Sequence, residues 1–239
     1  MDTNMIRQRV IAFQGDFPAT WEFLVELDPA FADAFSGYIS AAYDTDVLPV
    51  EIRELLLLAH DASVTVLDAE GVHLRVGRAL AAGATERQVV QVLELLTFIG
   101  LHGLTSGLCL ILEPADYEIP ESTRGPYWAA FEESAPGVHG MMAAALPAFF
   151  DAYRAVGSTI WRGDGLEPKW RELVLIVADM STTHLYTKGA RLHVQNALRY
   201  GATPQQVVAA LALTVTYATR ALDLGLAALV RHRPAQQEH

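Results

Sequence analysis

Residues 168–229 decide the fold, and they read PKWRELVLIVADMSTTHLYTKGARLHVQNALRYGATPQQVVAALALTVTYATRALDLGLAAL. Residues 50–111 repeat this pattern without a gap when 118 is added to each residue number. Arg-Glu-Leu at 53–55 recurs at 171–173, and about half of the positions compared between residues 53 and 90 are identical. A match of this length does not arise by chance, so the sequence predicts one helical unit that is present twice.

The repeat divides the chain of 239 residues into two small domains rather than one large one. We expect a first unit at residues 1–112, a linker at 113–127, a second unit at 128–231 and a polar tail at 232–239. The linker contains three prolines and a glycine, which oppose regular helix. No stretch shows a convincing strand alternation, so the expected class is all-α, with two helical bundles related by a pseudo-twofold axis.

The turn between two helices of each unit has clear boundary residues. Gly83 follows a helical stretch at the position that favours a left-handed backbone. Thr85 then caps the next helix, and Gln88, three residues later, completes a capping box. Thr203 and Gln206 repeat this arrangement in the second copy, so both copies predict a helix–turn–helix here.

The composition excludes several classes of function. The formal net charge of −11 argues against nucleic acid as a partner, because phosphate binding needs clustered Lys and Arg. The basic residues are scattered, so a small anionic substrate would need local positive sites within a negative protein. The single cysteine, Cys109, excludes an internal disulfide and a Cys-x-x-Cys redox pair. The chain opens on no sequence that resembles a signal peptide, so we expect a cytoplasmic protein.

Residues 95–112 carry no charge and are long enough to be tested as a membrane span. Glu94 and Glu113 flank the segment, and His102 interrupts it. Its counterpart in the second copy carries Arg220 in the middle of the helix. We therefore expect both segments to be helices buried in a soluble oligomer, and we expect no membrane partner.

The Arg-Glu-Leu helix is followed by a helix that ends His193-x3-Ala197-x3-Gly201-Ala-Thr. This pattern resembles the carboxymuconolactone decarboxylase family, which includes the alkylhydroperoxidase D-like proteins. The resemblance covers roughly residues 45–111 and 163–229. It implies a small all-helical unit that assembles as trimers or hexamers. For this chain we therefore expect a homo-oligomer, either a trimer of two-unit chains that forms a pseudo-hexamer, or a dimer.

The sequence departs from the family pattern at the positions that carry its chemistry. The peroxidase branch has cysteines seven and four residues before the family histidine, where this chain has Tyr186 and Gly189. Cys109 lies on a different helix without a partner thiol, so peroxidase activity is the least expected function. The decarboxylase branch has a glutamate where Gly189 stands, and the first unit has Arg75 in place of His193. We therefore expect the substrate pocket of this chain to be lined by different residues from those of the family.

We expect a cofactor-independent lyase, a decarboxylase, or an isomerase that acts on a small carboxylated or lactone-like metabolite. His193 is the expected proton-transfer group, with a buried core histidine as the alternative reading. His102 and Arg220 occupy equivalent positions in the two units and complete the predicted catalytic set. Arg220 has Asp223 three residues on, so a structural salt bridge is the alternative for this residue. A non-catalytic oligomeric ligand-binding or scaffold protein of the same fold is the alternative function.

The predicted substrate-binding residues come from both units. Helical spacing places Tyr186 and Tyr200 on the side of His193. Glu70, His73 and Arg75 lie close to the corresponding place in the first unit. No set of His, Asp and Glu has the spacing of metal ligands, and no phosphate loop, dinucleotide motif or nucleophile elbow is present. The sequence therefore predicts no metal and no cofactor.

Overall fold

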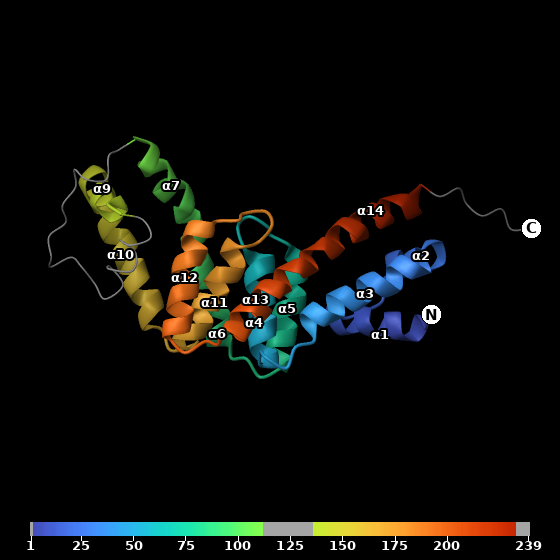
Figure 1. Ribbon diagram of the computed structural model, residues 1–239. Coiled ribbons are helices and arrows are strands. Elements are labelled where there is room, and N and C mark those ends of the chain that lie inside the picture. Colours follow the sequence, from blue (N-terminus) through green and yellow to red (C-terminus); the bar gives the residue numbers. More distant parts are fainter. Residues whose placement is uncertain (1, 112–135, 233–239) are drawn as a thin grey trace, which may run out of the picture.

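The computed structural model describes residues 2–111 and 136–232, and the regular elements of these two ranges are all helices (Figure 1). The all-α class expected from the sequence is confirmed. The predicted linker at 113–127 and nearly all of the predicted tail lie outside the described residues. The unit boundaries therefore stay a prediction.

Each half of the chain contributes a run of helices that ends in a short 3-10 helix and one more α-helix. The first half contains α1 (Thr3–Gln14), α2 (Ala19–Leu27), α3 (Pro29–Tyr43), α4 (Val50–Ala62), α5 (Ala69–Ala81), α6 (Glu86–Leu96), η1 (Thr97–Leu101) and α7 (His102–Ile111). The second half contains α9 (Val138–Ala145), α10 (Pro147–Arg162), α11 (Pro168–Asp179), α12 (Thr187–Arg199), α13 (Pro204–Leu213), η4 (Thr214–Ala218) and α14 (Thr219–Arg231).

Equivalent positions of the two halves adopt equivalent local structures. Both predicted capping boxes are confirmed, because Thr85 caps α6 with Gln88 and Thr203 caps α13 with Gln206. Even an unusual backbone feature recurs: Leu67 and its counterpart Leu185 have φ angles of 51° and 50°. A left-handed conformation is uncommon for a residue with a side chain. The recurrence is consistent with a tandem duplication.

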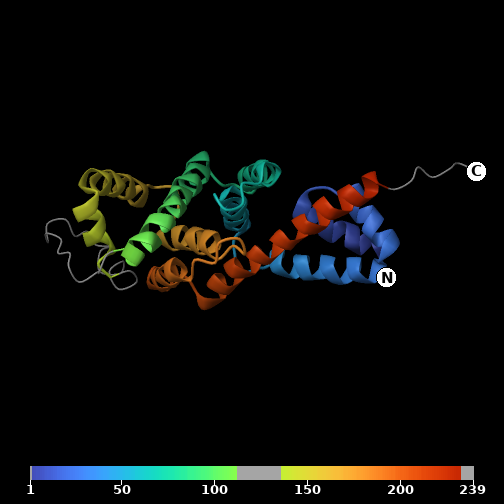
Figure 2. The same ribbon diagram turned by 90° about the horizontal axis from the view of Figure 1, so that it is seen from above.

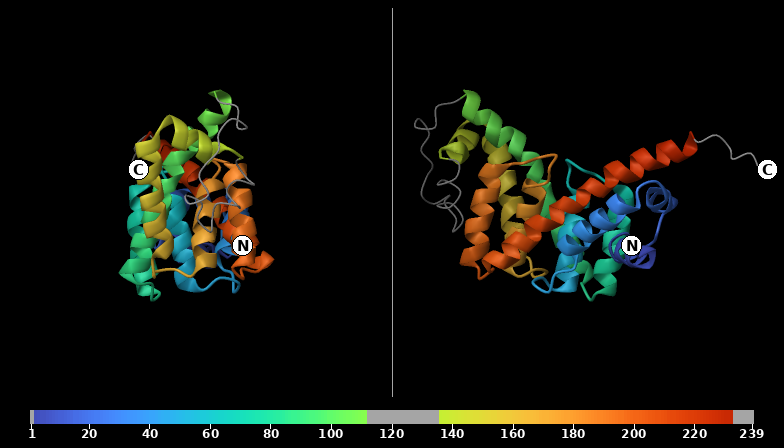
Figure 3. Two further views of the ribbon diagram at one scale, coloured as in Figure 1. Left: turned by 90° about the vertical axis from the view of Figure 1, so that its left-hand side faces the viewer. Right: turned by 45° about the vertical axis from the view of Figure 1, so that its right-hand side comes forward.

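The central core belongs to both halves. Helices α4 and α11 pack against each other in the middle of the molecule, with α6 and α13 beside them (Figure 3). The leucines 55–58 of α4 are each at most 1% exposed, and residues 173–178 of α11 are at most 2% exposed. A helix that is apolar on every side must be surrounded by protein, and here each central helix supplies part of the surroundings of the other. Neither half therefore has a core of its own in the middle of the molecule.

The last helix of each half packs on the first helices of the other half. Helix α14 lies along α2, where Leu222 and Leu226 join a cluster that contains Ile6 and Trp21. Helix α7 lies against α9 at the opposite end, where Leu108 is buried with Val138, Met141 and others. Figures 1 and 2 show α7 and α14 leaving the central helices toward opposite ends of an elongated chain. The two halves are thus interlocked by these two helices.

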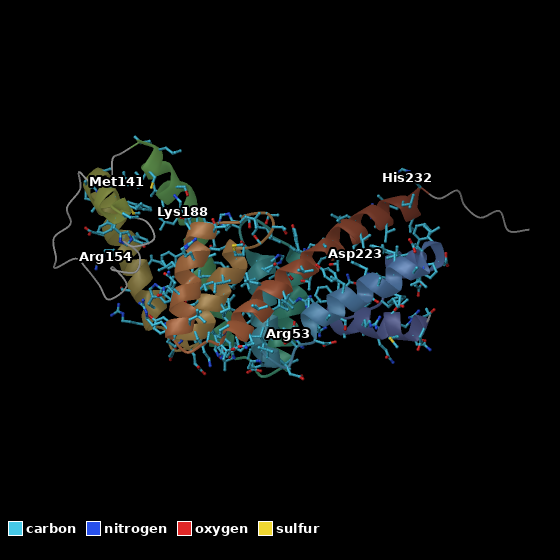
Figure 4. The ribbon with its side chains drawn as sticks, viewed as in Figure 1. Arg53, Met141, Arg154, Lys188, Asp223 and His232 are labelled. Atoms are coloured by element: carbon cyan, nitrogen blue, oxygen red, sulfur yellow. The ribbon has the colours of Figure 1, made fainter. Side chains whose placement is uncertain are left out.

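The cluster under α7 also contains a buried histidine. His139 of α9 lies 3.1 Å from the hydroxyl of Tyr153 through its Nε2 atom. Met141, on the same helix, is fully buried, while Arg154 extends from α10 nearby (Figure 4). Burial, together with the smaller effect of the Arg154 charge, lowers the pKa of His139 to about 4. Burial also raises the pKa of Tyr153 to about 12. Both groups are therefore neutral at pH 7.

The long apolar segments predicted from the sequence are present as continuous helical stretches. Glu86–Ile111 and Pro204–Arg231 are each long and apolar enough to cross a membrane by length and composition alone, and 28% of each apolar window is buried within the chain. Two such helices are weak grounds for a membrane location, because core helices of soluble proteins pass the same test. Leu110, Ile111 and Leu224 are 88%, 79% and 75% exposed. Cytoplasmic location and burial of these faces in an oligomer remain predictions.

We expect the stability of the protein to fall as the pH falls from 6.5 to 4, in part because of His139. In this window the unfolded chain binds a proton at this residue that the folded chain does not. His139→Gln removes the titrating group and keeps a polar atom near the Tyr153 hydroxyl. Urea unfolding across the window should show a shallower loss of stability for the variant. Equal slopes for variant and wild type would contradict this prediction.

Candidate functional site

Six polar or aromatic side chains meet where α12 begins, close to the position of Lys188 in Figure 4. Helix α11 supplies two carboxylates, the following loop and α12 supply three side chains, and α7 supplies one from the first half. We call this set the histidine cluster. It consists of His102, Glu172, Asp179, His184, Tyr186 and His193.

His193 and Glu172 are joined by a short hydrogen bond in which the donor and the acceptor can be assigned. The His193 Nδ1 atom lies 2.7 Å from Glu172 Oε2, and the Glu172 carboxylate is fully buried. A carboxylate accepts hydrogen bonds, so the Nδ1 atom carries a hydrogen and donates a hydrogen bond to Glu172. The Nε2 atom of His193 is then the basic nitrogen, and it faces Asp179 Oδ2 at 4.0 Å. The buried acid thus fixes both the ring orientation and the tautomer of His193.

Asp179 is a buried carboxylate that lacks a hydrogen bond within residues 2–111 and 136–232. Its side chain is fully buried, and neither oxygen has a hydrogen-bond partner in these two ranges. Desolvation raises the pKa of Asp179 to about 7, and the His193 charge opposes the rise. Buried polar groups nearly always have a partner, so a carboxylate in this state is an exception that points to a site.

His102 joins the cluster from α7. Its ring stacks on that of Tyr186 with the centroids 3.9 Å apart, and its Nδ1 atom lies 2.7 Å from His184 Nε2. Its Nε2 atom faces Asp179 Oδ1 at 3.7 Å. Burial lowers the pKa of His102 to about 4, with smaller contributions from the charges of His184 and His193. Burial also lowers the pKa of His184. Both rings are therefore neutral at pH 7, so they act as donors or acceptors rather than as cations.

The equivalent place in the first half holds a different set, which we call the arginine cluster. It consists of Glu54, Asp61, Asp68, Arg75 and Arg220. Arg75 stands where His193 stands in the second half, and its Nη1 atom donates to Glu54 Oε2 at 3.2 Å. Arg220 stands where His102 stands, and its Nη2 atom donates to Asp61 Oδ1 at 2.8 Å. Each carboxylate of this cluster is thus paired with a guanidinium.

The prediction of a local salt bridge between Arg220 and Asp223 is wrong. Arg220 reaches across to Asp61 and Asp68 of the first half. Asp223 instead accepts a hydrogen bond from the Gln14 side chain at 2.7 Å, on the part of α14 that passes over the N-terminal helices (Figure 4). Arg220 pairs with Asp61 rather than with Asp223 because Asp61 is a nearly buried carboxylate that requires a cation. Asp223 accepts hydrogen bonds from neutral donors instead.

The structure brings some of the predicted site residues together and leaves others apart. His193, His102 and Tyr186 meet in the histidine cluster, whereas Arg220 and Arg75 belong to the arginine cluster. The remaining three, Glu70, His73 and Tyr200, lie exposed on or at the end of α5 and α12. In the described ranges, no hydrogen bond, ion pair or ring contact joins these three to the histidine cluster.

Sequence reasoning did not select Glu172, Asp179 and His184 as site residues. A signal for two of them was present, because Glu172 and Asp179 are identical in both copies and lie in a helix that is otherwise apolar. An acid in such a helix is costly unless it is protonated or meets a donor or a cation, so its presence in both copies marks a special position. His184 left no such signal, since its counterpart in the first half is Val66.

Comparison with known proteins agrees with this architecture. The model of the carboxymuconolactone decarboxylase family matches residues 147–230. A crystal structure described as a "putative gamma-carboxymuconolactone decarboxylase subunit" from Burkholderia xenovorans superimposes with a TM-score of 0.83 and is 32% identical in sequence. The alignment covers 98% of this chain and 99% of that one. The chain belongs to the carboxymuconolactone decarboxylase family. A search among curated proteins finds no significant match.

The surroundings of Gly189 explain why this chain has no glutamate at this position, where the decarboxylase pattern has one. A Cβ atom on Gly189 would lie 2.4 Å from Asp179 Oδ2 and 2.6 Å from the Tyr186 ring. These distances are too short for any side chain, so the Asp179 carboxylate and Tyr186 now fill the space of the missing residue. Gly71 has the same constraint in the arginine cluster, where Asp68 and Asp61 are its nearest atoms.

We expect Gly189→Ala to destabilise the protein by roughly 1–3 kcal/mol, because Asp179 or Tyr186 must move to admit the methyl group. Gly77→Ala on α5 is the matched control, since no atom lies within 4 Å of its added Cβ. Alanine is the better helix former, so the control should gain about 0.5–1 kcal/mol. Urea unfolding of both variants measures the difference. A neutral effect of Gly189→Ala would show that the cluster is loosely packed.

Proposed function

We propose that the chain is a lyase or an isomerase that transfers a proton at carbon in a small carboxylated or lactone-like metabolite, without an organic cofactor. The observation that carries the proposal is the hydrogen bond from His193 Nδ1 to the buried Glu172 carboxylate at 2.7 Å. This arrangement leaves Nε2 of His193 as a base, or as an acid once protonated, at a fixed position. The family membership supports the same class of reaction.

The proton transfer follows from the arrangement of the cluster. In a decarboxylation, the carbon–carbon bond to the carboxylate breaks, carbon dioxide leaves and its electron pair moves into a conjugated carbonyl of the substrate. Protonated His193 Nε2 then gives its proton to the carbon. In an isomerisation, neutral Nε2 removes a proton from one carbon and returns it to another. Glu172 stabilises the imidazolium in both cases because its carboxylate accepts from Nδ1 throughout.

Hydroxyl and imidazole groups beside His193 are suited to stabilise a developing enolate. The Tyr186 hydroxyl lies 3.4 Å from Thr105 Oγ1, and the Tyr186 ring is stacked on neutral His102. Such donors stabilise negative charge on a substrate oxygen when they are held in place before the reaction begins. The stacking of Tyr186 and the link between His102 and His184 hold them.

The start of α12 offers a place for the carboxylate of a substrate. In the first half, the Asp68 carboxylate caps α5 by accepting from the Gly71 backbone N–H at 3.0 Å. Tyr186, the counterpart of Asp68, forms no side-chain cap on α12, and Lys188 lies exposed in the first turn. Helix N-termini attract anions. A substrate carboxylate that replaces the missing cap would lie next to the histidine cluster.

The composition of the arginine cluster supports a structural role for the first half and a chemical role for the second. A guanidinium does not exchange protons near neutral pH, so Arg75 cannot take the role of His193. Its bonds to Glu54, and those of Arg220 to Asp61, neutralise the carboxylates and hold α5 and α14 on α4. The proposed active site is therefore the histidine cluster alone.

We expect His193→Gln to lower kcat by about 10²–10⁴-fold, because it removes the proton-transfer group. Glu172→Gln should lower it as well, since the tautomer of His193 is no longer fixed. Turnover and deuterium incorporation from D₂O are measured by NMR on small carboxylated lactones, beginning with gamma-carboxymuconolactone. His73→Gln, which removes an exposed imidazole, is the control and should retain activity.

Two outcomes would contradict the proposal. Full turnover by His193→Gln would remove His193 from the reaction. A lactone that raises the melting temperature of the wild type but is recovered without deuterium would favour the non-catalytic, ligand-binding alternative.

A further inference from the structure

We propose that His102, His184 and Asp179 bind a divalent transition-metal ion, of the class represented by Zn²⁺. One donor atom from each residue lies within 4.8 Å of the donors of the other two. Two imidazoles and a carboxylate are the donors that zinc, cobalt, nickel and iron(II) prefer in proteins. This site goes beyond the proposed function, because binding of the ion does not depend on proton transfer by His193.

The Asp179 carboxylate is buried without a partner. Its exposed fraction is zero, and none of the described residues donates a hydrogen bond to either of its oxygens. The rings that face it, His102 at 3.7 Å and His193 at 4.0 Å, are too far away to donate to it. An ionised carboxylate in such a place is costly unless a cation or a metal ion approaches it.

The donor atoms lie close enough together for one ion to bridge a pair of them. Zinc lies about 2.0–2.2 Å from imidazole nitrogens and carboxylate oxygens, so one ion spans two donors that are up to roughly 4 Å apart. The 3.7 Å between His102 Nε2 and Asp179 Oδ1 falls within this reach. His184 Nε2 lies 2.7 Å from the other nitrogen of His102, so one ion binds both imidazoles only when this contact breaks and one of the rings turns.

The arginine cluster shows what partner the equivalent carboxylate has in the first half. Asp61 is the counterpart of Asp179, and it receives a cation from α14, because Arg220 donates to it at 2.8 Å. His102 replaces that arginine in the histidine cluster, and its Nε2 atom lies 3.7 Å from Asp179 Oδ1 without a hydrogen bond between them. The second half has therefore lost the guanidinium but kept the carboxylate. A metal ion held by His102, His184 and Asp179 restores the missing positive charge.

The first half could not bind an ion in the same way. Val66 stands where His184 stands, and Arg220 occupies the position of His102. The proposal therefore requires one strong site for each chain, and not two. The ligands come from α7, from the end of α11 and from the loop before α12. This origin in three separate elements is the reason that no metal-ligand spacing is visible in the sequence.

The test is titration of the full-length, tag-free protein with Zn²⁺ after dialysis against a chelator, followed by calorimetry. We expect one ion per chain and a higher melting temperature in its presence. Co²⁺ should give the visible absorption of a nitrogen- and oxygen-ligated ion. His184→Ala and Asp179→Asn should each weaken binding by at least tenfold, since loss of a ligand exceeds the usual effect of a residue that only orients one.

Matched variants separate this proposal from nonspecific binding and from the proposed function. His73→Ala removes an exposed imidazole and should bind Zn²⁺ like the wild type. His193→Gln should also keep the ion while losing turnover, so failure of one proposal is distinguishable from failure of the other. Wild-type affinity in His184→Ala, or no Zn²⁺-dependent heat in a wild type with normal circular dichroism, would overturn the metal site.

Discussion

The structure depends on four carboxylates that are buried in its two central helices. Glu54 and Asp61 in α4, and Glu172 and Asp179 in α11, are at most 5% exposed. A carboxylate in such a position destabilises the fold unless a donor or a cation meets it. Glu54, Glu172 and Asp61 find their partners on α5, α12 and α14. Helix α7 brings His102 to 3.7 Å from Asp179, which is too far for a hydrogen bond. The interlocked arrangement of the helices therefore answers an electrostatic requirement as well as an apolar one.

The two halves meet this requirement in different ways. The first half uses arginine, which carries a fixed charge and binds carboxylates with several donors. The second half uses histidine, which is uncharged when buried and can exchange a proton. The first half thus holds a network of carboxylates and guanidinium groups, and the second half holds a network of carboxylates and imidazoles. Under the proposed function, only the second network takes part in the chemistry.

Much of the fold was predictable from the sequence, because its signals are local or repeated. The offset of 118 residues, the glycine turn and the capping threonines each involve only neighbouring residues or direct identity. His193 was found in the same way, through a pattern within one helix. The partner of Arg220 was missed because Asp61 is 159 residues away, and only the crossing of α14 to the first half brings them together. His184 and Asp179 were missed for the same reason, since α7 carries His102 to them from the first half.

The crossing of α7 and α14 has a consequence for how such a protein can evolve. A freestanding single unit would lack the helix that completes its own site, and it would have to borrow one from a second molecule. In a symmetric pair of identical molecules every substitution appears in both sites at once. Fusion of two units into one chain removes that restriction, so a histidine in one copy can coexist with an arginine in the other. Linkage of two such units in one chain thereby allows their two sites to change independently of each other.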